Sequence, residues 1–296
     1  MNRRGFLLST GVVLVAGCAR SAPPDLATTT PSTSAVPLAI GDDGTPAGAM
    51  LAQLLCQAVR ASGGAAVLAP IGEDWQASLA DGSIAAVPAF AVTLWSQLSE
   101  GSDPPDGVDA LLSDVAGLLA PEVSVLGAAG VDGGLVWEVT GKTAADGITS
   151  LDRIAGWSKG KVVAIPPVAG SRADGIPGIK GVYRGAFTTA RLADPTQRAA
   201  QLVAGQVALA AFRRTEFTGV ANLVTLEDPD EIGLADPLVV LLDAALADAD
   251  PGAVLAMNGV AGVLTTVMLV ELQAKVAGGA GAAEVAGTWL VSQGLA

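Results

Sequence analysis

The regular alternation of apolar runs and helical stretches between residues 38 and 88 constrains the fold of this chain most. Short apolar runs typical of buried strands are separated by stretches whose apolar residues recur at helical spacing. Thr45 and Pro46 supply an N-cap and a proline at the first helical position. The predicted strands cover 38–41, 65–69 and 84–88, and the predicted helices cover 47–61 and 73–81. This order predicts an α/β fold with a mainly parallel sheet flanked by helices.

The same alternation continues along the rest of the chain. After the strand 84–88 we expect a loop that carries Phe90 and Trp95. Further helices are predicted at 108–119, 151–157 and 196–205, and extended segments at 123–130, 135–140, 161–167 and 207–212. Residues 223–228 and 238–246 are predicted to be strands or a strand followed by a helix. The C-terminal stretch 251–296 is predicted to be helical. Its part 253–270 is apolar enough for a membrane span, but polar residues and glycines interrupt it, so we expect a buried helix pair.

The first residues have the pattern of an export signal. MNRRGFLLSTGVVLVAGC (1–18) combines a basic start, an apolar stretch and a small-residue cleavage site, and Leu14–Cys18 has the form of a bacterial lipobox. We therefore expect cleavage before Cys18 and a lipid on its side chain, with an ordinary secretory signal as the alternative. Arg3 and Arg4 also match a twin-arginine export motif, and a plain basic start is the other interpretation.

Residues 19–37 are rich in Ser, Thr and Pro and predict a flexible tether between the lipid and the folded part. The predicted location is therefore the extracytoplasmic face of the bacterial cell membrane, with the membrane as a partner through the lipid anchor. The formal net charge of −13 argues against nucleic acid as a partner.

The sequence lacks the residues of common catalytic sites. It contains no His, which excludes a Ser–His pair, and the G-x-S-x-G match at 156–160 has a predicted helix before it and a strand after it, the reverse of a nucleophile elbow. No Cys/His cluster predicts a metal site. We therefore predict that the chain is not an enzyme and uses no cofactor.

Three segments carry a resemblance to a known family: SLADGSIAAVPAFAVT (78–93), DGIPGIKGVYRGAF (174–187) and QLVAGQVALAAFRRTE (201–216). They resemble motifs of the substrate-binding proteins of ABC importers for glycine betaine, choline and related quaternary amines. The match at 174–187 is the strongest of the three. The similarity extends over about residues 38–296.

The resemblance implies a two-lobe, type II periplasmic-binding-protein-like fold, each lobe a mainly parallel sheet flanked by helices. Lobe one would comprise 38–135 and 238–296, and lobe two 140–228, with crossings near 136–141 and 229–237. A small molecule, either a quaternary amine such as glycine betaine or choline or a diverged solute, would bind between the lobes of a monomer. The monomer would deliver it to an ABC permease in the membrane.

The resemblance also implies a set of ligand-binding residues, and the chain departs from the family pattern at several of them. The candidates are Asp42, Phe90, Thr93, Trp137, Phe212, Arg213 and Thr215. Phe90 and Phe212 stand where the family has tyrosines, alanines replace acidic residues, and Arg213 and Arg214 introduce cations. Two interpretations follow. In the first, the pocket takes a changed ligand that is larger, more apolar or anionic, and Arg213 or Arg214 would bind its carboxylate or phosphate. In the second, a degenerate binding fold acts as an envelope interaction or assembly module.

Overall fold

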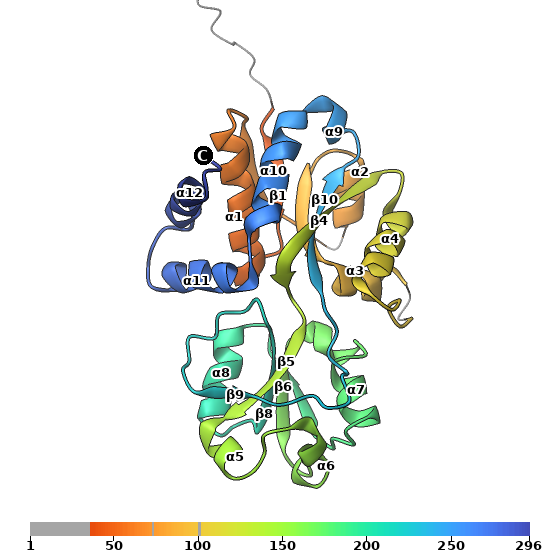
Figure 1. Ribbon diagram of the computed structural model, residues 1–296, viewed down its shortest axis with the longest axis vertical. Helices are drawn as coiled ribbons and strands as arrows, with labels where there is room; N and C mark the ends of the chain where they lie inside the picture. Colours follow the sequence, from red (N-terminus) through yellow and green to blue (C-terminus); the bar gives the residue numbers. More distant parts are fainter. Residues whose placement is uncertain (1–35, 73, 100–101) are drawn as a thin grey trace, which may run out of the picture. The chain divides into compact units, whose positions relative to one another are not determined.

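The computed structural model describes residues 36–72, 74–99 and 102–296, except the side chains of residues 128 and 129. These residues form one compact unit, Val36–Ala296. The predicted signal 1–18 with Cys18, and the predicted tether up to residue 35, lie outside the described residues. Figure 1 shows two sheets flanked by helices; we call residues 36–132 with 237–296 lobe one, and residues 135–225 lobe two.

Lobe one is built on a five-stranded sheet in the order β2-β1-β3-β10-β4. Its strands are β1 (Leu38–Asp42), β2 (Ala66–Pro70), β3 (Ala86–Phe90), β4 (Val123–Asp132) and β10 (Pro237–Asp243). The strands β1, β2 and β3 are parallel, and β10 runs antiparallel to both β3 and β4. β10, from the C-terminal part of the chain, therefore lies between β3 and β4, which come from its N-terminal part.

Helices cover both faces of this sheet. They are α1 (Pro46–Ala61), α2 (Trp75–Ala80), α3 (Ala91–Leu98), α4 (Val108–Leu119), α9 (Leu246–Ala249), α10 (Pro251–Val263), α11 (Thr266–Ala277) and α12 (Ala282–Gln293). Successive residues of β10 point to opposite faces: Val240 packs with α1, α10, α11 and α12, and Leu241 packs with α2, α3 and α4. α1 begins as predicted, with the Thr45 hydroxyl accepting the Gly48 amide at 3.0 Å.

Lobe two repeats the arrangement with the order β7-β6-β8-β5-β9. Its strands are β5 (Leu135–Thr140), β6 (Val162–Ile165), β7 (Thr188–Arg191), β8 (Leu209–Arg213) and β9 (Leu223–Thr225); its helices are α5 (Gly141–Ala145), α6 (Ile154–Trp157), α7 (Ile176–Gly181) and α8 (Pro195–Val203), with 3-10 turns at Leu151–Arg153 and Pro167–Gly170. β5 is antiparallel to β8 and β9, and β6 is parallel to β7 and β8.

The predicted fold class is confirmed, with three differences in detail. Each sheet is mixed, because the strand that follows a crossing runs antiparallel to its neighbours. β5 lies entirely in lobe two, so the first crossing is at Gly133 and Gly134 rather than near 136–141. Residues 91–98 form the helix α3 where we expected a loop, because the carboxylate of Asp236 accepts the Val92 amide at 2.7 Å from 144 positions away.

The apolar C-terminal stretch forms separate helices that pack into lobe one. Met257 of α10, Leu269 of α11 and Trp289 of α12 all belong to the core around α1. Among the described residues, no helix taken singly has the length and hydropathy of a membrane span, and α10 and α11 meet those criteria only as a pair bent by 100°.

The first crossing makes a prediction about Gly134. A Cβ at this position would lie 2.4 Å from the Leu234 carbonyl oxygen of the second crossing. We expect Gly134→Ala to lower the free energy of unfolding by about 1–3 kcal/mol through this overlap, measured by urea denaturation.

The matched control is Gly117, which lies in α4 with open space around the position of a Cβ. Gly117→Ala should raise stability by about 0.5–1 kcal/mol because alanine favours the helix. Equal effects of the two substitutions would contradict the close approach at the crossing.

Candidate functional site

A cleft of about 740 Å³ lies between the two lobes and has walls from both. Lobe one contributes the start of α1, the end of β3 and the first turns of α2 and α3. Lobe two contributes the end of β8 and the turn Pro166–Val168 that follows β6. Strand ends and helix starts therefore converge on one space, which is where α/β proteins bind ligands.

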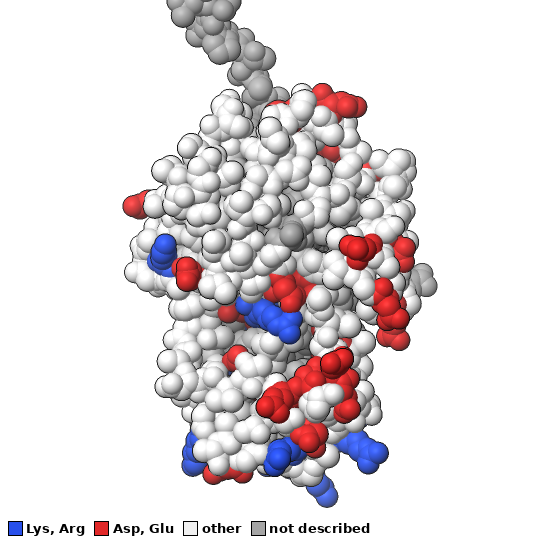
Figure 2. Space-filling view, in the orientation of Figure 1, with Lys and Arg blue, Asp and Glu red and all other residues white. Residues whose placement is uncertain are grey.

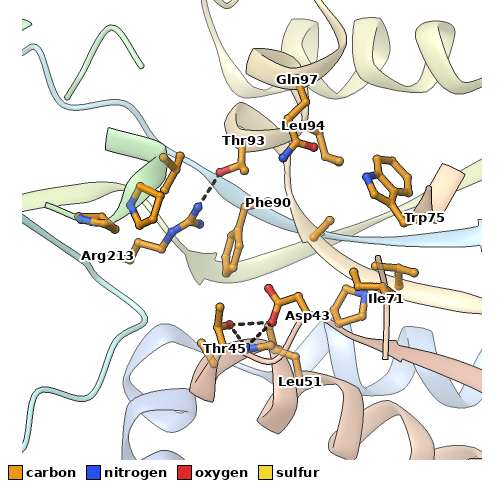
Figure 3. A pocket seen from close by; sticks show the side chains of 18 of the residues that line it. Asp43, Thr45, Leu51, Ile71, Trp75, Phe90, Thr93, Leu94, Gln97 and Arg213 are labelled. Atoms are coloured by element: carbon orange, nitrogen blue, oxygen red, sulfur yellow. Dashed lines mark hydrogen bonds between the residues drawn. The ribbon is translucent and has the colours of Figure 1, made fainter. Parts of the chain in front are cut away.

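One wall of the cleft is apolar. Leu51, Ile71, Trp75 and Leu94 line it, and Figure 3 shows Arg213 on one side of Phe90 and Trp75 on the other. Trp75 begins α2 and is half-buried against the core that contains α3 and α4. The wall can pack against an apolar ligand body.

Thr93 of α3 joins the two lobes. Its hydroxyl donates to Asp236 Oδ2 at 3.1 Å and accepts from Arg213 Nη2 at 2.8 Å and from Arg172 Nη1 at 3.1 Å. Both arginines belong to lobe two. One hydroxyl thus uses its donor and both lone pairs on groups that approach from different segments of the chain.

Asp236 and Arg172 form the centre of this buried network. Arg172 donates to both oxygens of Asp174, from Nε at 2.8 Å and Nη2 at 2.7 Å, and donates from Nη1 to Asp236 Oδ2 at 2.5 Å. Burial lowers the pKa of Arg172, but its hydrogen bonds and the charges of Asp174 and Asp236 outweigh this and raise it. The side chains of all three residues are almost fully buried.

Arg213 completes the charge balance of the network. Its Nη1 lies 3.8 Å from Asp236 Oδ2, and its guanidinium carbon lies 5.1 Å from the centre of the Phe90 ring. The pKa of Arg213 is lowered, chiefly because burial removes water from the cation, and its side chain is 14% exposed. With Arg172 and Asp174, the network contains two positive and two negative groups. We call these four residues with Thr93 the inter-lobe cluster.

The two crossings hold Asp236 in place. Asp132 Oδ1 accepts the amides of Gly134 and Asp236 at 2.8 Å each, and the Gly133 amide donates to the Asp236 carbonyl at 2.8 Å. Asp132 Oδ2 accepts from Arg214 Nη1 at 2.5 Å. Arg214 therefore belongs to the crossing, with its side chain 42% exposed.

A second carboxylate shapes the chain just before Asp236. Asp228 accepts the Gly233 amide at 2.7 Å, the Ile232 amide at 3.2 Å and the hydroxyl of Tyr183. Burial and this hydrogen bond to Asp228 raise the pKa of Tyr183. Tyr183 thereby connects the second crossing to the end of α7.

Three of the predicted ligand residues meet at the cleft: Phe90, Thr93 and Arg213 all line it. They come from the end of β3, the first turn of α3 and the end of β8. Arg213 faces the cleft and Arg214 does not line it, which separates two neighbours that the sequence left equivalent.

The structure places Trp137 and Phe212 in the core of lobe two, and we withdraw both from the candidate site. Trp137 is 4% exposed on the buried side of β5. Phe212 is 1% exposed, and the guanidinium carbon of Arg198 lies 5.3 Å from its ring centre. β8 is covered on both faces, so even a residue beside Arg213 points into the core.

Asp42 and Thr215 also lie outside the cleft lining. Asp42 Oδ1 accepts the Gly44 amide at 2.8 Å, and its neighbour Asp43 lines the cleft instead. Thr215 is fully buried where α11 meets lobe two, and its carbonyl accepts from Gln273 at 2.7 Å. In both cases the residue one position further along the chain, Asp43 or Glu216, lines the cleft instead.

Sequence reasoning missed Asp43, Trp75, Arg172, Glu216 and Asp236. Asp236 lies in the predicted second crossing, and this position was the one feature of the sequence that pointed to a place between the lobes. Arg172 had none, because its partners in the inter-lobe contact, Asp236 and Thr93, are 64 and 79 positions away. Glu216 accepts from Arg198 and from the Arg213 amide at 3.0 Å, an arrangement that only the fold creates.

The described side chains include no group of three or more His, Cys, Asp or Glu placed to hold a metal ion. Comparison by sequence finds no protein-family model and no curated protein that matches the chain.

Comparison by structure finds two-lobe binding proteins, and the chain has their type II periplasmic-binding-protein-like fold. A structure described as a glycine betaine/carnitine/choline ABC transporter matches with a TM-score of 0.71 and 17% identity, over 87% of this chain and 99% of that chain. Apo YehZ from Escherichia coli matches with 0.67 and 18%, over 88% and 100%. Lactococcal OpuAC, complexed with glycine betaine, matches with 0.62 and 13%, over 86% and 95%. The predicted resemblance is thus confirmed at the level of fold.

The inter-lobe cluster makes a prediction about Asp236. Asp236→Ala leaves two buried arginines without a shared partner and the start of α3 without its carboxylate. Removing one partner of a buried ion pair costs about 3–5 kcal/mol, so we expect a loss of that size in urea denaturation.

Asp106 is the control, because it is exposed and no hydrogen bond or ion pair reaches it among the described residues. Asp106→Ala should change stability by less than about 0.5 kcal/mol. A loss below 1 kcal/mol for Asp236→Ala would show that the cluster does not hold the lobes.

Proposed function

We propose that the protein is a solute-binding protein that captures a small molecule between its two lobes and delivers it to an ABC permease. The observation that carries this proposal is the cleft of about 740 Å³ with walls from both lobes. Its size lies within the range of about 300–1,000 Å³ for small-molecule sites. The similar structures support the proposal, because their descriptions include an ABC transporter for glycine betaine, carnitine and choline and a choline-binding protein complexed with choline.

The proposed mechanism is binding by a monomer, without catalysis. The chain crosses between the lobes at 133–134 and 226–236, in addition to the contacts of the inter-lobe cluster. Small changes at those two segments would let the lobes close on a solute. Trp75 and Phe90 would contact the body of the solute from lobe one. The turn Pro166–Val168 would contact it from lobe two.

We place the protein on the extracytoplasmic face of the bacterial membrane, held by a lipid on Cys18. The lipobox pattern of residues 14–18 supports this location. Two or more acyl chains hold a protein stably on a bilayer. The twin-arginine pattern at Arg3 and Arg4 supports export in the folded state.

A second candidate function is an envelope interaction or assembly module on a binding-protein fold. The inter-lobe cluster favours it, because Arg172, Arg213 and Asp236 bridge the lobes with the chain's own charges. A protein whose lobes hold each other in this way has less need of a solute to order them.

A ligand screen separates the two functions. We expect at least one solute among quaternary amines, primary amines, amino acids, polyamines and phosphorylated head groups to raise the melting temperature of the full-length protein in detergent. The shift should grow with concentration by mass action. The absence of any shift, together with copurification of an envelope protein other than a permease, would favour the second function.

Trp75 should then be needed for binding of the solute that the screen finds. Trp75→Ala removes apolar contact area worth about 1.5–3 kcal/mol. The affinity of this variant for the solute should therefore fall about tenfold or more in calorimetric titration. Trp95 is the matched control, a half-buried tryptophan of the same lobe that does not line the cleft. Equal losses of affinity in Trp75→Ala and Trp95→Ala would contradict binding of the solute in the cleft.

The location has its own test. Cys18→Ser should move the protein from the membrane to the soluble fraction, because the acyl anchor is lost. Cys56→Ala is the control; Cys56 is fully buried in α1, so this variant should stay with the membrane. Membrane retention of Cys18→Ser would contradict the lipid anchor.

A further inference from the structure

We propose that the cleft selects solutes with an apolar body and one positive charge, and that it rejects solutes that carry a carboxylate. This inference rests on the proposed function and names the class of solute for the same site. Four features of the described residues carry it: the occupied donors, the shielded arginine, the free carboxylate oxygens and the apolar wall.

The groups best suited to bind a carboxylate already hold one. Asp236 takes the Val92 amide at the start of α3, the Thr93 hydroxyl and Arg172 Nη1. An amide at a helix start, a hydroxyl and an arginine together make an anion site. Asp236 therefore fills that site from within the chain, and an entering carboxylate would have to displace it.

Arg213, the cation that lines the cleft, is also engaged. Its Nη1 lies 3.8 Å from Asp236 Oδ2, its Nη2 donates to Thr93, and its guanidinium carbon lies 5.1 Å from the centre of the Phe90 ring. A second anion beside it would give the buried inter-lobe cluster a net negative charge, which a low-dielectric site disfavours.

The negative groups that line the cleft have oxygens to spare. Asp43 uses Oδ1 for the amide and hydroxyl of Thr45, at 2.9 and 2.8 Å, and Glu216 uses Oε2 for Arg198 and the Arg213 amide. Among the described residues, no hydrogen bond reaches Asp43 Oδ2 or Glu216 Oε1, and no ion pair involves Asp43. Asp43 is thus an exposed carboxylate of the lining without a direct ion-pair partner, although it also attracts Arg213 at longer range, and it can bind a cation.

The position of Asp43 fits a cation with an apolar body. Figure 3 shows its carboxylate beside Leu51, with Ile71 and Trp75 further along the same side of the cleft. A solute could place its charge at Asp43 and its body along Ile71 and Trp75. The carboxylates that gather on the surface in Figure 2, and the formal charge of −13, add a field that steers cations toward the protein.

The test uses three probes that share one apolar frame: 2-phenylethylammonium, 2-phenylethanol and phenylacetate. Each is titrated calorimetrically into the full-length protein in detergent. We expect the ammonium to bind most tightly, the alcohol more weakly and the carboxylate at least about tenfold more weakly than the ammonium. In Asp43→Asn the ammonium should lose about tenfold in affinity, while the alcohol should be unchanged; Asp106→Asn is the control outside the cleft.

A second measurement tests the built-in carboxylate. Acetate should raise the melting temperature of Asp236→Ala more than that of the wild type, because it can occupy the vacated donors of Arg172, Thr93 and the Val92 amide. Chloride at equal ionic strength is the control. If Asp236→Ala does not fold, Asp236→Asn replaces it, and this variant should bind phenylacetate more tightly than the wild type does.

The outcomes distinguish this inference from the proposed function. Tightest binding of phenylacetate, or an unchanged ammonium affinity in Asp43→Asn, would overturn the inference and leave solute binding intact. Failure of all three probes while a carboxylate solute from the wider screen binds would do the same. Failure of every solute in both experiments would overturn the proposed function itself.

Discussion

The carboxylate of Asp236 is the interaction on which the rest of the arrangement depends. It lies at the second crossing and bonds to the start of α3 in lobe one and to Arg172 in lobe two. Asp132 holds its amide and so ties the two crossings to each other. A buried ion pair adds little net stability compared with an apolar core, but its strict geometry can specify one arrangement. Here that arrangement is the spacing of the cleft walls.

The same fold can serve different solutes because the charges in the cleft are set by few residues. The rings of Phe90 and Phe212, two residues that the family resemblance assigned to ligand binding, lie beside Arg213 and Arg198 of the chain itself. A cation–π contact made inside the protein leaves less of the ring for a solute. The structural similarity to betaine- and choline-binding proteins therefore describes the scaffold, and the lining residues decide the solute.

Much of the fold follows from local pattern, and part of the site from the family resemblance. The strands and helices of lobe one up to residue 90 follow from apolar periodicity and from the capping pair Thr45 and Pro46. Phe90 and Phe212 were predicted to lie at the cleft because they stand where the family has tyrosines, and Trp137 because it lies near the predicted first crossing. Neither a motif position nor a place near a crossing determines which face of a strand a side chain occupies. In β8 both faces are buried, so alternation gave no signal.

The sequence by itself determined the α/β class and the scarcity of catalytic groups, because these depend on neighbours along the chain and on composition. The two-lobe order of elements came from the family resemblance. Only the tertiary structure decided that residues 91–98 are a helix, that β5 and β10 run antiparallel to their neighbours, and that Asp236 shares its charge between Arg172 and Arg213. The physical reason is distance along the chain. A hydrogen bond between residues 64 or 144 positions apart leaves no periodic trace in the sequence, and it exists only once the lobes have packed.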